Sequence, residues 1–374
     1  MLNFNLKENI SRILFAHFHI RNLHILFLFF CFQLSAQDTS RVTMLFAGDI
    51  MGHGPQINAA WDSANKTWDY TPVFQFVKPT IEKADIAIGN LEVTLAGPPY
   101  LGYPQFSSPD MLAIACKDAG FDVLATANNH CVDRGRLGLE RTIKILDSLN
   151  IKYTGTFYNK AHRDTTYPLV LKKNEMSISL LNYTYGTNGI PVPEGNIVNL
   201  IDKIQISQDI QKADSQNTDI TIPYIHWGIE YERQANATQK DLAKFLIHEG
   251  CGAVIGSHPH VVQPIELIRK ESSDTLNILP VVYSLGNFVS NQRDRYKDGG
   301  IMVQFTINKT ATKTFITNFK YIPYWVYKGV LNGKYQYYII PTEQYLEAPD
   351  KFNIPQESRD KLLEFVNDIR SMFQ

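Results

Sequence analysis

The amino-acid sequence predicts an α/β fold in one compact domain with a β-rich C-terminal edge. Two observations lead to this prediction. Short apolar runs typical of buried strands alternate with longer segments whose apolar residues recur at helical spacing. Hydrophobic residues make up 44% of the 374 residues and charged residues 20%, which is a globular composition and excludes a disordered, collagen-like or coiled-coil chain.

Residues 1–37 have the layout of a secretory signal peptide. Basic residues precede a short apolar run, Leu26–Phe32, and small residues follow it. The run is shorter than the roughly 20 residues that a membrane-spanning helix needs. We therefore expect an exported protein, periplasmic or at the cell surface, whose mature chain begins near Gln37 or Asp38. A membrane anchor is the alternative interpretation.

The first half of the chain alternates strands with helices. The best-bounded helix, Ser107–Ala119, has a start signal at Ser108-Pro109-Asp110 and is followed by Gly120. The predicted elements are, in order, strand Val42–Ala47, helix Thr71–Lys83, strand Asp85–Gly89, helix Ser107–Ala119, strand Phe121–Ala127, helix Leu137–Leu149, and strands Ile151–Gly155 and Met176–Tyr183.

The second half continues this alternation and then becomes rich in strands. Its apolar runs predict buried strands, and its last three strands have the pattern of an antiparallel edge. The predicted elements are helix Ile201–Ala213, strand Ile220–Ile225, helix Lys240–His248, strands Cys251–Ile255, Val281–Leu285, Ile301–Ile307, Thr314–Tyr321 and Tyr335–Pro341, and helix Arg359–Phe373.

Polar residues follow five of the predicted strands at their carboxyl ends, which is where ligands bind in open α/β sheets. These residues are Asp49, Asn90 and Glu92, Asn129 and His130, His226, and His258 and His260. Carboxylate and amide oxygens together with neutral imidazoles suit Mn, Fe, Zn or Mg. No cysteine is among them, so a thiolate zinc site is not expected. We predict a site for two divalent metal ions, which would lower the pKa of a bridging water.

The motifs resemble those of the bacterial CapA-type capsule synthesis proteins, which are linked to poly-γ-glutamate and resemble the calcineurin-like metallophosphatases in fold. They run in family order from about residue 43 to 305. The motifs are Gly48-Asp49-Ile50-Met51, Gly89-Asn90-Leu91-Glu92, Ala127-Asn128-Asn129-His130 followed by Asp133 and Gly135, His226-Trp227-Gly228-Ile229-Glu230-Tyr231, Gly256-Ser257-His258-Pro259-His260 and Tyr283-Ser284-Leu285-Gly286-Asn287-Phe288. The resemblance implies a four-layer αββα sandwich over residues 38–310, with an extension, residues 311–374, packed on the same domain.

The resemblance also implies roles for individual residues. His130 is implied as the imidazole that protonates the leaving group or steadies the transition state. Asn128 is grouped with His130 and Asp133 in the catalytic set, as a turn residue or one that supports the ligands, in preference to being a ligand itself. Asp133, with Arg134, either orients His130 or binds an anion, or else Asp133 caps the helix that starts near Gly135. The implied metal ligands are Asp49, Asn90, Glu92, Asn129, His226, His258 and His260.

Two residues depart from the metallophosphatase pattern. Met51 stands where that superfamily has a histidine ligand, and Asn90 stands where it has a bridging aspartate. Both departures belong to the capsule subgroup, and they leave catalysis open. His53 is an alternative ligand near the first strand.

Two classes of function follow. The first is a metal-dependent hydrolase or transferase that acts on an exported phosphoester or γ-linked glutamyl bond. The second is a non-catalytic accessory protein that binds or passes an anionic polymer such as poly-γ-glutamate, and a membrane-bound capsule synthesis complex is a further implied partner. The formal net charge of −1 gives no global basic field, so nucleic acid is not an expected partner.

Two further sets of residues have simpler interpretations. The cysteines of the mature chain, Cys116, Cys131 and Cys251, are odd in number, so at least one is expected as a free, buried thiol. An aromatic cluster is expected in the core or at its rim, in preference to a platform for a polymer. Its members are Tyr321, Tyr324, Trp325, Tyr327, Tyr335, Tyr337 and Tyr338.

Overall fold

The computed structural model describes residues 39–269 and 277–373, so the predicted signal peptide lies outside the described residues. Residues 40–269, 277–309 and 313–373 form one compact unit, and Thr39 and residues 310–312 fall outside it. The helices are α2 (Gly54–Ala60), α3 (Thr71–Phe74), α4 (Lys78–Ile81), α5 (Met111–Asp118), α6 (Gly135–Ser148), α7 (Lys160–Thr166), α8 (Lys203–Ser215), α9 (Ala237–His248), α10 (Thr342–Glu347), the 3-10 helix η1 (Pro349–Lys351) and α11 (Gln356–Phe373).

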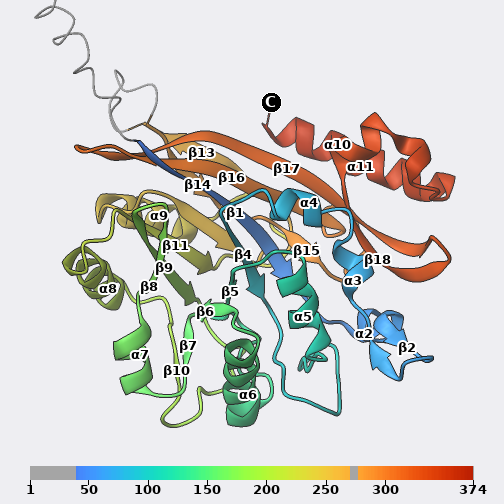
Figure 1. Cartoon of the computed structure of the whole chain (residues 1–374), viewed down its shortest axis with the longest axis horizontal. Helices are drawn as coiled ribbons and strands as arrows, with labels where there is room; N and C mark the ends of the chain where they lie inside the picture. The colour runs from blue at the N-terminus through green and yellow to red at the C-terminus, as the bar shows by residue number, and fades with distance from the viewer. Residues whose placement is uncertain (1–38, 270–276, 374) are drawn as a thin grey trace, which may run out of the picture. The chain divides into compact units, whose positions relative to one another are not determined.

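Most of the strands belong to two large mixed sheets (Figure 1). The first sheet has the order β18-β17-β16-β1-β4-β5-β6, with β15 also paired to β1, and the second has the order β13-β14-β12-β11-β9-β8. The strands are β1 (Ser40–Ile50), β2 (Trp61–Asp62), β3 (Thr67–Trp68), β4 (Ile86–Leu91), β5 (Val123–Ala125), β6 (Lys152–Thr154), β7 (Thr156–Phe157), β8 (Leu169–Lys173), β9 (Met176–Thr184), β10 (Ile197–Val198), β11 (Ile220–His226), β12 (Val254–Ser257), β13 (Ile265–Ile268), β14 (Leu279–Val282), β15 (Asn287–Val289), β16 (Gly299–Lys309), β17 (Thr314–Leu331) and β18 (Lys334–Pro341).

The two sheets pack face to face, and helices cover their outer faces. On β1, Met44 and Phe46 belong to the core cluster shared with the second sheet, whereas Leu45 belongs to the cluster shared with α3, α4 and α5. This alternation is the two-residue period of a strand buried on both faces. On the second sheet, α8 and α9 supply the outer cover. The predicted four-layer αββα sandwich is therefore confirmed.

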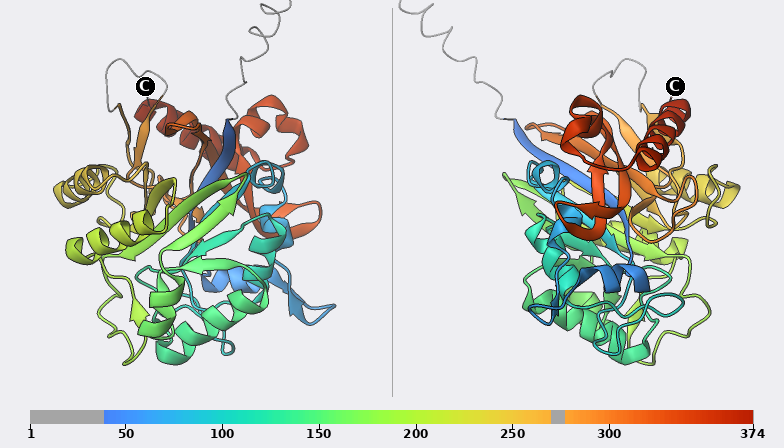
Figure 2. Two further views of the ribbon diagram at one scale, coloured as in Figure 1. Left: turned by 60° about the vertical axis from the view of Figure 1, so that its left-hand side comes forward. Right: turned by 90° about the vertical axis from the view of Figure 1, so that its right-hand side faces the viewer.

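The C-terminal helices pack on the same face of the first sheet as the second sheet does. Buried residues of α11 share one core cluster with Trp325 and Tyr327 of β17 and with Tyr338 of β18. In Figure 2 these red helices lie against the orange strands. The predicted core role of the aromatic cluster is confirmed for these three residues and for Tyr324 and Tyr337, which are also buried, whereas Tyr321 and Tyr335 are exposed.

Several predicted elements differ from the structure in their bounds, and three of these differences have a clear physical reason or consequence. The single helix expected at Thr71–Lys83 is two short helices, α3 and α4, each with a proline in its first turn. Proline suits the start of a helix but disrupts its interior, so a second proline divides the segment. The strand expected at Thr314–Tyr321 extends to Leu331, because its second half pairs with β18. The strand expected at Val281–Leu285 ends as β14 at Val282.

Beyond β14 the chain crosses from the second sheet to the first. The Leu285 amide donates to the Gly256 carbonyl of β12 at 3.1 Å, and the next carbonyl, that of Gly286, accepts from the Asp49 amide of β1 at 3.1 Å. Strand β15 then pairs in parallel with β1. A Cβ atom on Gly48 would lie 2.0 Å from the Gly286 oxygen, so this close approach requires glycine at position 48.

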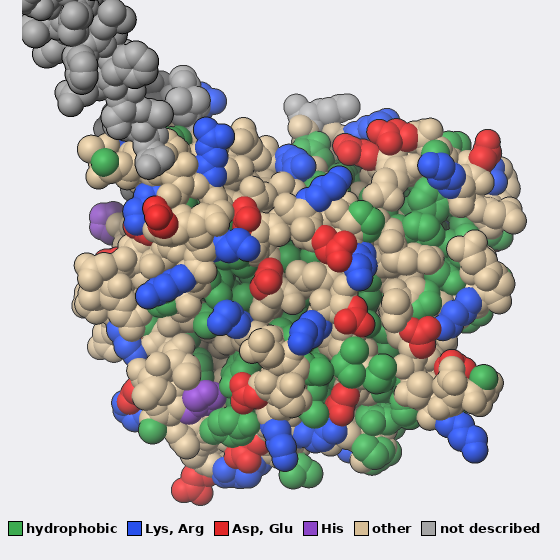
Figure 3. Space-filling model, in the orientation of Figure 1, with side chains coloured by type: hydrophobic (Ala, Val, Ile, Leu, Met, Phe, Trp, Pro, Cys, Tyr) green, Lys and Arg blue, Asp and Glu red, His purple; other side chains and the backbone are tan. Residues whose placement is uncertain are grey.

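No helix within residues 39–269 and 277–373 is long and apolar enough to cross a membrane. On the face shown in Figure 3, basic and acidic side chains are interspersed over the surface. The chain as a whole has nearly equal numbers of the two kinds of residue, 36 Lys and Arg against 37 Asp and Glu.

Candidate metal centre

The carboxyl ends of strands from both sheets bring the predicted metal ligands together. Asp49 and Asn90 are the last residues but one of β1 and β4 in the first sheet, and His226 is the last residue of β11 in the second sheet. The remaining predicted ligands lie in the loops that follow β4, β5 and β12. All of these side chains are buried, with exposed fractions of 0% for Asp49, Asn90, Glu92, Asn129 and His226, 3% for His258 and 1% for His260.

Glu92 lies at the middle of this group. Its Oε1 atom is 3.6 Å from His226 Nε2 and 3.7 Å from His260 Nε2, and it has no hydrogen-bond partner. Nitrogen and oxygen ligands at about 2.0–2.2 Å from a metal ion lie roughly 3–3.5 Å from one another. Glu92 forms candidate metal-binding groups with His226 and His258, and with Asp49 and His260. A buried carboxylate oxygen that faces imidazoles without a hydrogen bond fits a metal ligand.

Asp49 holds the ring of His260 in place. Asp49 Oδ2 lies 3.0 Å from His260 Nδ1, so the other ring nitrogen of His260 faces Glu92. Asp49 Oδ1 accepts a hydrogen bond from Asn90 Nδ2 at 2.8 Å. Carboxylates that hold histidine ligands in this way fix the tautomer and the ring orientation. Asp49 also remains within reach of the ligand atoms of Glu92 and His260.

Asn90 joins the two carboxylates of the site through its amide group. Its Nδ2 atom donates to Asp49 Oδ1 and, at 3.3 Å, to Glu92 Oε2. Asn128 Nδ2 donates to Asn90 Oδ1 at 3.1 Å, which fixes the orientation of the Asn90 amide. Asn128 Oδ1 also accepts from the backbone amide of His130 at 3.1 Å. Asn128 therefore positions its neighbours within the site.

Two imidazoles of the second sheet are held in the neutral form. Burial lowers the pKa of His226 well below its usual range and lowers the pKa of His258 to about 3. His226 Nε2 lies 2.9 Å from Asn129 Oδ1, and His226 Nδ1 lies 3.0 Å from Ser257 Oγ. His258 Nδ1 is buried without a hydrogen-bond partner. The neutral imidazole is the form that binds metal ions, and His258 Nδ1 has a lone pair available for one.

His130 and Asp133 form a hydrogen-bonded pair beside this cluster. His130 Nδ1 lies 2.8 Å from Asp133 Oδ2, which also accepts from the backbone amide of Phe106 at 2.8 Å. A charge on His130 would lower the pKa of both His226 and His258, so His130 acts electrostatically on the cluster. Helix α6 begins after Arg134 without a side-chain cap, so the alternative that Asp133 caps this helix is wrong.

Two residues near the first strand, His53 and Met51, belong to none of the candidate metal-binding groups among the described residues. His53 Nδ1 lies 3.1 Å from Gln56 Oε1, and burial lowers the pKa of His53 to about 4. His53 is in none of the candidate metal-binding groups that residues 39–269 and 277–373 form. Met51 is buried in the core cluster on the outer face of the first sheet.

The sequence analysis missed two residues that contact the histidines. The Tyr185 ring lies 4.5 Å from the His258 ring and is stacked on the His226 ring, and Tyr185 is 47% exposed. Ser257 contacts His226 as described above. Ser257 could have been found, since it lies within the Gly256-Ser257-His258 motif, whereas no motif marks Tyr185.

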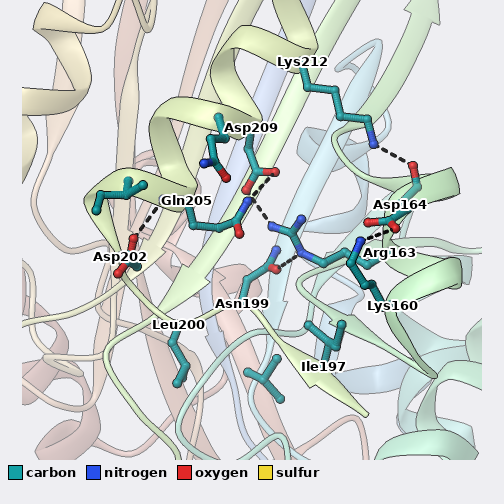
Figure 4. A pocket seen from close by; sticks show the side chains of 13 residues that line it. Lys160, Arg163, Asp164, Ile197, Asn199, Leu200, Asp202, Gln205, Asp209 and Lys212 are labelled. Carbon is teal, nitrogen blue, oxygen red and sulfur yellow. Dashed lines mark hydrogen bonds and ion pairs between the residues drawn. The ribbon is translucent and has the colours of Figure 1, made fainter. Parts of the chain in front are cut away.

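A surface pocket of about 810 Å³ lies between α7 and α8, away from the predicted ligands. Four of its charged side chains form two ion pairs, as Figure 4 shows: Arg163 with Asp209 and Lys160 with Asp164. No predicted site residue lines this pocket. The buried cluster at the strand ends is therefore the candidate site.

Comparisons with known proteins place the chain among capsule proteins. The capsule biosynthesis protein CapA of Bacillus anthracis is 28% identical over 293 residues, 74% of this chain and 66% of that protein. The PGA biosynthesis protein CapA of Bacillus subtilis (strain 168) is 28% identical over 252 residues, 65% of this chain and 63% of that protein. The chain thus spans slightly less than two thirds of the length of these relatives.

Among solved structures, the calcineurin-like phosphoesterase YfkN from Bacillus subtilis aligns with a TM-score of 0.44 and 14% identity, over 76% of this chain and 90% of that chain. The NAD nucleotidase NadN of Haemophilus influenzae aligns with a TM-score of 0.47 and 11% identity, over 88% of this chain and 60% of that chain. Residues 43–292 match the model of the family described as bacterial capsule synthesis protein PGA_cap. Because this match covers well over half of the chain, the protein belongs to the PGA_cap family of bacterial capsule synthesis proteins.

Proposed function

We propose that this protein is a metal-dependent hydrolase or transferase that acts on an exported anionic capsule polymer such as poly-γ-glutamate. The observation that carries the proposal is the unpaired, buried Oε1 atom of Glu92, which faces His226 and His260. The polymer is suggested by the family, whose relatives are described as proteins of capsule and PGA biosynthesis. An exported phosphoester is the alternative substrate.

The donor set fits a divalent metal ion. Glu92, His226, His258 and His260, with Asp49 and the amides of Asn90 and Asn129, would hold it at the strand ends. A metal ion bound there supplies Lewis acidity to a carbonyl or phosphoryl oxygen and lowers the pKa of a water molecule. The mixture of imidazole and oxygen donors suits Zn, Mn or Fe.

The pair of His130 and Asp133 would handle the proton of the leaving group. Asp133 accepts from His130 Nδ1, which leaves His130 Nε2 free to donate or accept a proton. The Phe106 ring packs edge-on against the imidazole at 4.7 Å and limits its rotation. This arrangement is that of a histidine oriented by a buried carboxylate.

Metal content tests the proposal. We would measure bound metal by elemental analysis in the purified wild-type protein, in Glu92→Gln and in the control Glu266→Gln, which changes an exposed carboxylate on β13. The expected result is at least one equivalent of transition metal in the wild type and in the control, and its loss in Glu92→Gln. A wild-type protein that binds no metal after reconstitution with Mn or Zn overturns the proposal.

A second candidate is the non-catalytic accessory protein that binds the capsule polymer. It is favoured by the amide of Asn90, which links the carboxylates of Asp49 and Glu92 where the resemblance implies a bridging aspartate. A metal-free wild-type protein that binds poly-γ-glutamate would support this candidate.

We also infer export, on the basis of the signal-peptide pattern in residues 1–37. Expression of the full chain in a bacterium, followed by fractionation and N-terminal sequencing, tests it. Recovery of a chain that begins near Asp38 outside the cytoplasm is expected. An intact chain that remains in the cytoplasm contradicts the inference.

A further inference from the structure

Two basic side chains lie close together beside the loop that follows β15, and neither forms an ion pair in the described part of the chain. Arg293 lies in that loop, and Lys328 lies on β17. Burial and the positive charge of Arg293 both lower the pKa of Lys328, so the two cations repel each other. Burial also lowers the pKa of Arg293, and the charge of Asp298 offsets this only in part. That carboxylate accepts a hydrogen bond from Trp325 Nε1 at 2.6 Å instead.

The side chains around this basic pair, Arg293 and Lys328, offer more hydrogen-bond donors than acceptors. Lys328 Nζ, at 2.9 Å, and the Tyr337 hydroxyl both donate to the same oxygen, Asn291 Oδ1. Arg293 Nη2 donates to the Val326 carbonyl at 2.6 Å, whereas Arg293 Nη1 is buried with no hydrogen-bond partner. A buried, charged donor without a partner destabilises a protein, so it calls for an acceptor. The group that this arrangement lacks is an anion.

Aromatic side chains hold the two cations in place. The guanidinium of Arg293 lies 5.4 Å from the centre of the Trp325 ring, and the ammonium of Lys328 lies 5.4 Å from the centre of the Tyr337 ring. Lys328 and Tyr337 are opposite each other on the paired strands β17 and β18. Cation–π contacts of this kind fix the position of a charge without neutralising it. Both cations are partly exposed, so the basic pair is accessible from solvent.

The loop that carries Arg293 connects the basic pair to the candidate metal centre. Strand β15, which precedes the loop, pairs with β1 so that Asn287 lies opposite Asp49. Within the loop, Gln292 Nε2 donates to the Tyr231 hydroxyl at 3.3 Å, and the Tyr231 ring lies 6.1 Å from the His260 ring. An anion held by the basic pair therefore lies beside the centre but outside its ligand set.

We propose that Arg293 and Lys328 form an anion-binding subsite that holds a carboxylate of the capsule polymer while another part of the same polymer chain lies at the metal centre. This inference rests on the proposed function, which supplies the polymer, and it names residues that bind it. Every residue of a γ-linked glutamate chain carries a free α-carboxylate, so carboxylates recur at a regular interval from the reacting linkage. Arginine and lysine bind such groups through charge-assisted hydrogen bonds.

The place of the subsite favours a polymer over a small phosphoester. A small phosphoester carries its negative charge on the reacting phosphoryl group, which would lie at the metal ions. The basic pair lies outside the group of candidate metal ligands, so it suits a charge that the substrate carries away from the reacting bond. A polymer of linked glutamates has such charges, because its carboxylates are not part of the linkage.

Two lysines of β17 give a matched test in the purified protein. Lys328→Gln removes the charge but keeps a donor for Asn291, and Lys320→Gln removes an exposed charge from the same strand. The probe is a fluorescently labelled oligomer of γ-linked glutamate, whose Kd is measured by fluorescence anisotropy at low salt. The Kd should rise at least about tenfold in Lys328→Gln and change by no more than about twofold in Lys320→Gln. The same oligomer with its carboxylates converted to amides should bind the wild type no more tightly than it binds Lys328→Gln.

Arg293 is tested with two substitutions, because its side chain also holds the Val326 carbonyl. Arg293→Gln removes the positive charge and should raise the Kd at least about tenfold. Arg293→Lys keeps the charge and should raise the Kd less. Equal Kd values in the two variants would overturn the role of the Arg293 charge. The melting temperature of each variant, expected to match that of the wild type, excludes loss of folding as the cause.

Metal content, measured on the same samples, separates this inference from the proposed function. Weaker binding of the oligomer by Lys328→Gln, in a protein that holds no metal, supports the subsite and overturns the metal-dependent chemistry. Equal binding by the wild type and Lys328→Gln, in a protein that holds metal, overturns the subsite and leaves the proposed function intact. Binding of inorganic phosphate that Lys328→Gln abolishes, without binding of the oligomer, overturns the polymer as the ligand and assigns the basic pair to a phosphoester.

Discussion

A carboxylate buried in a protein needs a proton or a cation, and Glu92 is such a carboxylate. Burial and the neighbouring Asp49 raise the pKa of Glu92 well above its usual range. Among residues 39–269 and 277–373, the charged or titratable groups of opposite sign that face its Oε1 atom are the imidazoles of His226 and His260, and no lysine or arginine pairs with it. A bound divalent cation would balance the charge that the surrounding residues do not balance.

The substitution Asp133→Asn tests the role of the histidine beside the cluster. It keeps the shape of the side chain but removes the charge that orients His130. If the protein is the proposed enzyme, kcat should fall by about 10²–10⁴-fold, because the imidazole loses its correct tautomer. Bound metal should stay at the wild-type level, since Asp133 belongs to none of the candidate metal groups among the described residues.

Hydrolysis of a phosphoester and of a γ-glutamyl peptide would be measured beside metal content, with Asp147→Asn on α6 as the control. An unchanged kcat in Asp133→Asn would show that Asp133 has only a structural role and does not assist His130 in catalysis. The double variant His130→Asn/Asp133→Asn should lose no more activity than His130→Asn does, since the two residues act as one unit.

At the level of single residues, the sequence predicted which side chains would gather, because they end strands and strand ends meet at one edge of a sheet. It could not predict that Asp49 contacts His260, or that Asn90 lies between two carboxylates, because these contacts depend on side-chain geometry across both sheets. Tyr185 was missed since a tyrosine after a strand carries no distinctive signal.

Helix α11 shows how one element completes the core of the first sheet. Its buried residues, Leu362, Phe365, Val366 and Ile369, recur at helical spacing and join the core cluster of β16 and β17. The inner face of the long strand β17 would otherwise present apolar side chains to solvent. The C-terminal helix is therefore part of the hydrophobic core.

Two adjacent leucines of α11 give a matched test of this packing. Leu362 is fully buried, whereas Leu363 is 41% exposed. Leu362→Ala should lower the free energy of unfolding by about 2–5 kcal/mol, because it leaves a cavity. Leu363→Ala should change it by no more than about 0.5 kcal/mol. Urea denaturation followed by circular dichroism measures both, and equal effects of the two substitutions would contradict the packing of α11.

At the level of elements, strong periodicity predicted most strands and helices, and the errors have physical causes. Pro79 lies within the segment expected as one helix and stands in the first turn of α4 instead. The length of β17 depends on its pairing with β18, which local pattern does not reveal. The short strand β15 depends on a pairing with β1, which is more than 230 residues away in the sequence.

For the molecule as a whole, the three cysteines in the described residues mark three separate parts of the core. Cys116 lies in the cluster under α5, Cys131 in the small cluster beside α6, and Cys251 in the cluster under α9. All three are buried free thiols, as the sequence predicted for at least one of them. Burial raises the pKa of the Cys131 thiol from 9.0 to about 12 and raises the pKa of the other two as well.

Alkylation with iodoacetamide at pH 8 should therefore leave all three thiols unmodified in the native protein and modify them once urea unfolds it. Mass spectrometry of tryptic peptides measures the modification at each site.

The raised pKa of the buried thiols also has a consequence for the stability of the protein. Above pH 9 the thiols ionise in the unfolded chain but not in the folded one, so the free energy of unfolding should fall as the pH rises from 9 toward 12. Rapid labelling of Cys131 in the folded protein would contradict its burial.

The short crossing from the second sheet to the first bears on the mechanics of the site. Leu285 is hydrogen-bonded to one sheet, and the next residue, Gly286, is hydrogen-bonded to the other. The candidate metal ligands come from both sheets, so the distances between them stay constant only if the sheets do not slide past each other. The segment Leu285-Gly286 opposes such sliding next to Asp49, whose amide donates to the Gly286 carbonyl. Because the backbone there resists displacement, thermal motion of the two layers would leave the distances between the metal ligands nearly unchanged. A single substitution at position 286 could thus loosen the centre without altering any group that binds the ion.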